Sequence, residues 1–131
     1  MADELAEALV FAYRPHVERR LAERGLTIDV SPAIDAGEQW LAEALADLLD
    51  RPFSEQSRGP LEVFQEAMRF PTAALSDAGV EPVDRDEVTA NALPGDVYDL
   101  APASSRDLGE EVWRAHLLWG ARKARALGDR G

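Results

Sequence analysis

Apolar residues recur at the spacing of a helical turn along almost the whole chain, and this periodicity limits the fold more than any other feature. Residues three and four positions apart share one face of an α-helix, whereas a half-buried strand requires strict alternation of apolar and polar residues. The clearest case lies between residues 31 and 51, where the apolar face has Trp40 at its edge and consists of Ile34, Gly37, Leu41, Ala44, Leu45, Leu48 and Leu49. The pattern predicts an all-α fold.

Proline and glycine residues indicate where the first helical segment, residues 3–24, is expected to bend and where it ends. Pro15 lies inside this segment and has no amide hydrogen, so we expect a kink or a break near Arg14. Gly25 is suited to end the helix because it adopts a left-handed backbone without strain. Residues 26–30 read as a short strand, but the sequence offers no clear second strand and therefore favours an extended linker.

The second and third helices also have clear start and stop signals. Ser31 as N-cap and Pro32 at the first helical position predict the start of the second helix, and residues 51–52 (Arg-Pro) predict its end. A third helix is expected from residues 59–60 (Gly-Pro) to Gly79, with a kink or a split at Phe70-Pro71. The inward faces of the first and third helices are predicted to consist of Leu5, Leu9, Ala12, Tyr13 and Val17, and of Val63, Phe64, Ala67, Met68 and Leu75.

Residues 80–103 are the least regular part of the sequence and predict a long acidic loop before the C-terminal helix. Three prolines interrupt this segment, and a short helix over residues 86–93 is compatible with its pattern. Ser104 or Ser105 is expected to cap the last helix, which should run to about Leu127. The sequence as a whole predicts one compact, irregular helical bundle of four to five helices, with residues 1–131 forming a single domain.

Composition excludes several classes of partner and site. The chain has 131 residues, 46% of them apolar and 30% charged, which suits a globular domain with its own core. Its net charge of −11 argues against binding to nucleic acid or to an anionic membrane surface, since both require basic side chains. It has no cysteine, no apolar run long enough to cross a membrane and no basic leader at its start. We therefore expect a cytoplasmic protein without a cofactor.

The C-terminal helix carries one candidate ligand pocket. Trp113, His116 and Trp119 follow one another at three-residue spacing, with His116 near the middle of an otherwise apolar stripe, and Lys123 lies two turns after His116 on the same side. A histidine among apolar residues is either a hydrogen-bonded structural group or a ligand or general base in a pocket. In the second case Trp113 and Trp119 would form the walls, and Lys123 would help to bind a small anion.

Two further residues could join such a pocket. His16 lies on the inner side of the first helix, and Glu38 falls among the apolar residues of the second. If the first and last helices lie side by side, His16 and His116 could bind a metal ion together with Glu38. The simpler interpretation of Glu38 is that a carboxylate in the first turn is stabilised by the helix dipole. The chain lacks the Glu-x-x-His pattern of di-metal bundles, and we predict no metal site.

The loop before the last helix offers a candidate interaction segment. Leu93, Val97, Tyr98 and Leu100 are apolar residues among acids, around a turn at Pro94-Gly95. They either bind a partner or clamp the loop onto the bundle.

No catalytic constellation is present in the sequence, so we expect a non-enzymatic protein-interaction module. Its partner would be another protein or a second copy, with a basic surface attracted to residues 29–50 and 77–99, which hold six acids and no base, and seven acids and one base. The alternative is a small-ligand or metal-dependent enzyme or binder with a Trp-lined pocket around His116.

Overall fold

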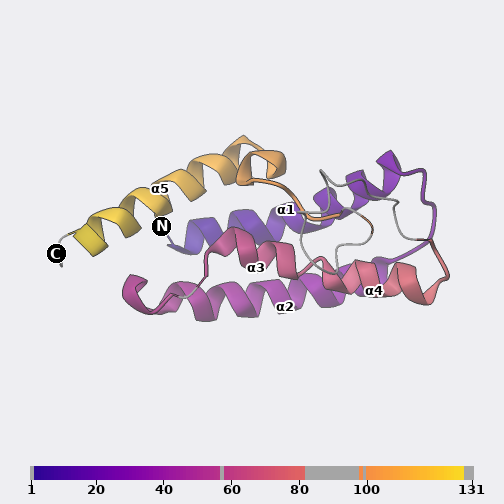
Figure 1. Cartoon of the computed structure of the whole chain (residues 1–131), viewed down its shortest axis with the longest axis horizontal. Coiled ribbons are helices and arrows are strands. Elements are labelled where there is room, and N and C mark those ends of the chain that lie inside the picture. The colour runs from indigo at the N-terminus through magenta and orange to yellow at the C-terminus, as the bar shows by residue number, and fades with distance from the viewer. Residues whose placement is uncertain (1, 57, 82–97, 99, 129–131) are drawn as a thin grey trace.

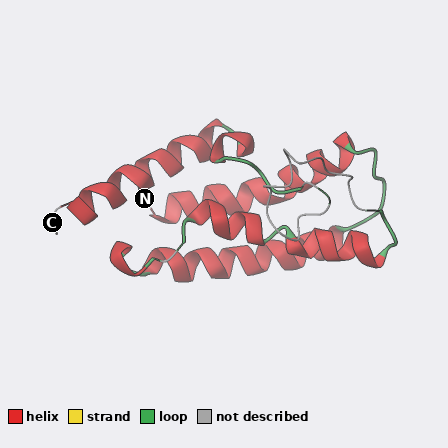
Figure 2. Cartoon of the chain, viewed as in Figure 1, coloured by secondary structure: helices red, strands yellow, loops and turns green. Residues whose placement is uncertain are grey.

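A computed structural model gives the structure of the chain and describes residues 2–56, 58–81, 98 and 100–128. The helices are α1 (Ala2–Glu23), α2 (Ser31–Asp50), α3 (Pro60–Glu66), α4 (Arg69–Asp77) and α5 (Glu110–Gly128), with two short 3₁₀ turns, η1 (Phe53–Glu55) and η3 (Ser105–Leu108) (Figures 1 and 2). The described residues contain no strand, so the predicted all-α fold is confirmed. The suggested helix over 86–93 and most of the predicted acidic loop lie outside the described residues.

The long helices lie roughly along one axis, with α1 in contact with both α2 and α5 (Figure 1). Helices α2 and α5 run opposite to α1, while α3 and α4 follow one another in the direction of α1. Helix α2 also contacts α3 and α4. Helix α1 therefore joins the α2–α3–α4 side of the molecule to α5, which also contacts η1.

Helix α1 continues through Pro15 for 22 residues, so the predicted break near Arg14 does not occur. Pro15 is exposed, and its ring therefore meets solvent rather than a packed neighbour. The helix ends where predicted, and Gly25 takes a positive φ of 68°. Residues 26–30 form an extended linker without strand pairing.

The start of α2 differs from the prediction in one detail. Ser31 is the first helical residue and makes no side-chain cap, and Val30 occupies the N-cap position. The Asp29 carboxylate instead accepts the Ser31 backbone N–H at 3.0 Å. Hydrogen bonding from the Ser31 side chain, and then from this backbone N–H, lowers the pKa of Asp29 because it stabilises the charged form.

The predicted third helix is split, and Pro71 explains where. A proline at 71 cannot donate to the carbonyl of Ala67, and its ring crowds that carbonyl. Helix α3 accordingly ends at Glu66, and α4 begins at Arg69 after a turn over residues 67–68. The Ala67 carbonyl instead accepts the Tyr13 hydroxyl at 2.7 Å.

Tyr13 reaches that carbonyl across α2 at Gly37, where the two helices come close. A Cβ atom built on Gly37 would overlap the Tyr13 hydroxyl and ring. Burial raises the pKa of Tyr13, and the nearby charge of Glu38 raises it further, so the hydroxyl stays protonated and donates. One side chain thus ties α1 to the α3–α4 junction past the backbone of α2.

The core contains most of the side chains that the helical pattern placed inward. Every predicted inward residue of the first and third helices is buried, except Ala12, which is half-buried. On α2 the buried residues are Ile34, Gly37, Leu41, Leu45 and Leu48. The hydrophobic spacing alone therefore identified the packed faces of these helices.

The C-terminal helix begins later than predicted. Ser104 does form a capping box with Asp107, but it caps the 3₁₀ turn η3. Gly109, with a φ of 118°, separates η3 from α5. A residue other than glycine rarely adopts this φ, so Gly109 sets the angle at which α5 leaves η3 and crosses α1.

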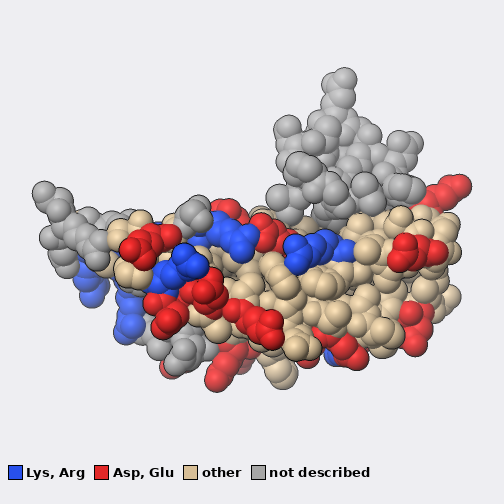
Figure 3. Space-filling view, turned by 90° about the horizontal axis from the view of Figure 1, so that it is seen from below, with Lys and Arg blue, Asp and Glu red and all other residues tan. Residues whose placement is uncertain are grey.

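Acidic side chains extend along the face that carries α2 and α4, with basic ones among them (Figure 3). The acids of α2 pair with bases of neighbouring segments, Glu38 with Arg14 at 3.6 Å and Asp47 with Arg51 at 3.2 Å. None of the ion pairs observed among the described residues joins α5 to α2.

We predict that Gly37→Ala destabilises the fold by about 2 kcal/mol, because the added methyl group displaces Tyr13 from its bond to Ala67. Gly120→Ala is the matched control, since nothing lies within 4 Å of a Cβ at this helical position. That change should stabilise the fold by roughly 0.5–1 kcal/mol through the better helix propensity of alanine. Urea unfolding checks both, and equal effects of the two substitutions would contradict the account.

Candidate functional site

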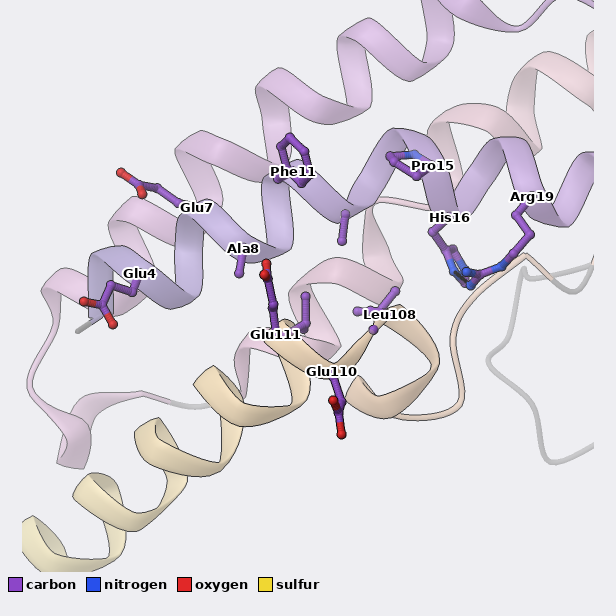
Figure 4. Close-up of a pocket in the computed structure, with 13 residues that line it drawn as sticks. Glu4, Glu7, Ala8, Phe11, Pro15, His16, Arg19, Leu108, Glu110 and Glu111 are labelled. Carbon is purple, nitrogen blue, oxygen red and sulfur yellow. Dashed lines mark hydrogen bonds between the residues drawn. The ribbon is translucent and has the colours of Figure 1, made fainter.

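A groove of about 690 Å³ lies between α1 and the start of α5 (Figure 4). Residues of α1 between Glu4 and Arg19 form one wall, and residues 108–112 form the other. The groove exists because Gly109 turns the chain between η3 and α5 and because small residues of α1, Ala8 and Ala12, line its floor.

A second groove of about 610 Å³ lies on the other flank of Phe11, toward α2. Its apolar lining includes Ala6, Val10 and Ala42. Phe11 and Pro15 border both grooves. Phe11 thus forms a ridge between two hollows, and it is 82% exposed, far more than any other large hydrophobic side chain among the described residues.

The carboxylates around the first groove come from both helices. Glu4 and Glu7 of α1 and Glu110 and Glu111 of α5 border it. In Figure 4, Glu111 points toward α1 while Glu110 points away. Glu110 pairs with Arg114 at 3.7 Å, whereas none of the other three forms an ion pair with a described residue. The groove is therefore apolar at its floor and acidic at its rim.

The basic residues near the two grooves are engaged in other contacts. Arg14 pairs with Asp35 and Glu38 of α2, and the hydrogen bond to Asp35 raises the pKa of Arg14. Arg19 donates to the carbonyl of Asp107 at 2.8 Å. Both guanidinium groups are thus bound to other acceptors and do not neutralise the carboxylates at the rim of the first groove. The rim therefore carries a net negative charge.

Pro15 removes one backbone donor from α1 at this site. In a regular helix the N–H of residue 15 would donate to the carbonyl of Phe11, but proline has no amide hydrogen. The Phe11 carbonyl is therefore free of its usual partner, beside the exposed Phe11 ring. The exposed Pro15 ring lies over this carbonyl and extends the apolar surface next to Phe11.

His16 lies at the end of the first groove, and both of its ring nitrogens are bonded within the fold. Its Nε2 lies 2.7 Å from the carbonyl of Leu100, and its Nδ1 lies 3.1 Å from the Arg19 guanidinium. A carbonyl only accepts and a guanidinium only donates, so His16 is neutral with its proton on Nε2. In Figure 4 the Arg19 side chain bends back to the His16 ring. Burial lowers the pKa of His16, consistent with the neutral form.

The residues proposed for a pocket around His116 are placed in contact with one another or with other segments. The rings of His116 and Trp119 have centroids 5.8 Å apart, and Lys123 Nζ lies 5.0 Å from the Trp119 ring centroid. Trp113 instead carries Arg106 over its ring at 4.7 Å. His116 is half-buried, and burial lowers its pKa. The two tryptophans therefore have different packing partners.

His16, Glu38 and His116 do not form a common site. His16 packs against Phe64, with ring centroids 5.9 Å apart, and Glu38 pairs with Arg14. Among the described residues, no three histidine or acidic side chains come together closely enough to hold a metal ion.

The loop residues expected as anchors are buried where the structure describes them. Tyr98 is 3% exposed and donates its hydroxyl to the carbonyl of Val80 at 2.6 Å, and Leu100 is fully buried. These two side chains clamp their segment onto the bundle and are not available to a partner. Leu93 and Val97 lie outside the described residues.

The Phe11 surface has one signal in the sequence, which is not part of the apolar pattern of the core. Phe11 stands seven residues from both Glu4 and Glu18, on the polar side of its helix. A large aromatic residue on a charged helical face does not pack into the core of its own chain, and such exposed apolar side chains mark candidate interaction surfaces.

Comparison with known protein families, with curated proteins and with solved structures finds no match to this chain. Among the described helices, none is long and apolar enough to cross a membrane.

Because the pKa of His16 in the folded chain lies below its ordinary value of 6.5, the unfolded chain binds more protons between these two values. We therefore predict that protonation of His16 lowers the free energy of unfolding as the pH falls below about 6.5. His16→Gln, which keeps an N–H near Leu100, should show a smaller loss than the wild type in urea unfolding at a series of pH values. Parallel stability curves for the two proteins would contradict this role.

Tyr98→Ala should lower the free energy of unfolding by about 3 kcal/mol, because a buried ring and its hydrogen bond are removed. Tyr98→Phe keeps the ring and should cost about 1 kcal/mol. Chemical denaturation measures both, and an unchanged midpoint for Tyr98→Ala would show that the side chain is not part of the core.

Proposed function

We propose that the chain is a helical protein-binding module whose docking surface is the face around Phe11. We call this surface the Phe11 face and define it by Phe11, Pro15, Glu4, Glu7 and Glu111. The observation that carries the proposal is the position of Phe11, exposed between two apolar grooves. Large exposed apolar features of this kind mark interaction sites on soluble proteins.

The chemistry of the face identifies the class of partner. An apolar floor takes aliphatic side chains at helical spacing. The carboxylates of Glu4, Glu7 and Glu111 on the rim form no ion pair with a described residue and take arginine or lysine. We infer that the occupant is an amphipathic helix whose apolar stripe is flanked by bases.

The groove gives little support to a catalytic role. His16 is the one titratable base that borders it with a lowered pKa, and both of its ring nitrogens are bonded within the fold. A general base needs a free nitrogen within reach of the proton that it removes. The carboxylates of the rim are therefore better explained as groups that attract a basic partner.

A synthetic helical peptide with leucines at three- and four-residue spacing and arginines on their flanks tests the proposal. In a ¹⁵N-labelled titration, its binding should shift the amide signals of residues 4–19 and 108–112. We predict that Phe11→Ser weakens the affinity roughly tenfold or more, since a central apolar anchor is lost. Ile28→Ser is the matched control, because Ile28 is also exposed but lies in the linker after α1.

A peptide with the same leucines and with glutamate in place of arginine separates apolar docking from simple charge attraction, and it should bind more weakly. If Phe11→Ser and Ile28→Ser bind the basic peptide equally well, or if the shifted signals lie elsewhere, the proposed docking surface is wrong.

A further inference from the structure

The chain itself carries a helix with the chemistry that the Phe11 face requires. Leu117 and Leu118 of α5 are each 51% exposed. Arg114, Arg122 and Arg125 are exposed on the same helix. Leu118, Arg122 and Arg125 follow one another at spacings of four and three residues, so they share one face of α5. We call this surface the basic face of α5.

The two surfaces open on the same side of the molecule. Glu111 precedes Leu118 by seven residues and therefore lies on the same face of α5. Glu111 also lines the groove that Phe11 borders. The basic face of α5 thus continues from the groove toward the C-terminal end of the helix. In Figure 1 α1 runs in the opposite direction, and the C-terminal end of α5 extends past the N-terminal end of α1.

Both surfaces carry charges that form no ion pair within the part of the chain that the structure describes. Glu4, Glu7 and Glu18 on α1, and Arg122 and Arg125 on α5, make no ion pair with any described residue. A second copy can supply the opposite charge to each.

We propose that the occupant of the Phe11 face is the basic face of α5 from a second copy of this chain. The inference rests on the proposed function and names its partner. In a twofold arrangement the same patch is buried on both copies, so α1 of each copy contacts α5 of the other. The Phe11 ring then meets Leu118 of its partner, and the acids of α1 meet the partner's arginines, twice in each dimer.

Charge favours this arrangement over a pairing of α1 with α1. The latter sets the glutamates of the Phe11 face against one another, and like charges placed opposite each other across an interface cost several kcal/mol. The reciprocal α1–α5 arrangement instead places the glutamates of α1 opposite the arginines of α5 at both contacts. An antiparallel pairing of α5 with α5 would set Glu111 against Arg125, so the variants below distinguish it from the reciprocal arrangement.

The available face is long enough for such an interface. Helices α1 and α5 have 22 and 19 residues, and a rise of 1.5 Å per residue makes each about 30 Å long. Two adjacent helices of this length present an area of the order of the roughly 800 Å² per partner that stable complexes bury.

Charge reversal on each face, followed by mixing, tests the proposal. Sedimentation velocity should find the wild type as a dimer at micromolar to millimolar concentration. The variants E4R/E7R and R122E/R125E should each be monomeric, with the dissociation constant raised roughly tenfold or more. An equimolar mixture of the two variants should form a 1:1 heterodimer, because each altered face then meets a face of opposite charge.

Control variants separate this result from unfolding and from the change in net charge. E43R/E62R reverses two exposed glutamates on α2 and α3 and should leave the wild-type dimer unchanged. Circular dichroism should show that all variants keep their helix content. Should one charge-reversal pair lose its fold, Phe11→Ser and Leu118→Ser replace it, and each of these should also dissociate the dimer.

Several outcomes would overturn the proposal. Wild type that is monomeric at millimolar concentration overturns it, and so do two monomeric variants whose mixture stays monomeric. Dissociation by E4R/E7R but not by R122E/R125E would indicate an α1–α1 dimer, and the reverse an α5–α5 dimer. A monomeric wild type that still binds the basic peptide through Phe11 would reject the second copy and keep the docking surface.

Discussion

The close approach of α1 and α2 at Gly37 is the constraint on which the rest of the fold depends. It lets the Tyr13 hydroxyl reach the Ala67 carbonyl, which Pro71 has released from regular helical bonding. A single side chain of α1 therefore fixes three backbone segments. With its inner side committed to α2 and to the α3–α4 junction, α1 turns Phe11 outward, beside the surface that α5 covers only in part.

Helical spacing was enough to predict the fold class and most of the core, because burial of one face per helix is a local property of the sequence. The break at Pro71 was predicted for the same reason. The continuation of α1 through Pro15 was not, because it depends on whether the proline ring meets solvent or a packed helix. The start of α5 depends on Gly109, whose φ of 118° reflects the angle between η3 and α5.

The candidate site was harder to predict than the fold. His116, Trp113 and Trp119 stood out by residue type, yet the structure places them in packing contacts. Tyr98 and Leu100 stood out as apolar residues in a loop, and they are buried. The Phe11 face draws on two helices that lie far apart in the sequence, and only the packing of α5 against α1 creates its grooves. A surface of this kind has no local signature beyond one aromatic residue among glutamates.

The same packing separates the charges of the chain into an acidic face on α1 and a basic face on α5, which is the basis of the proposed pairing between copies. The most direct measurement is an isotope-filtered NOE experiment on a mixture of labelled and unlabelled protein, which detects only contacts between copies. The account predicts NOEs between the Phe11 ring and the Leu118 methyl groups of the second copy. NOEs that join Phe11 to Phe11, or none at all from Phe11 at concentrations where the dimer is populated, would contradict it.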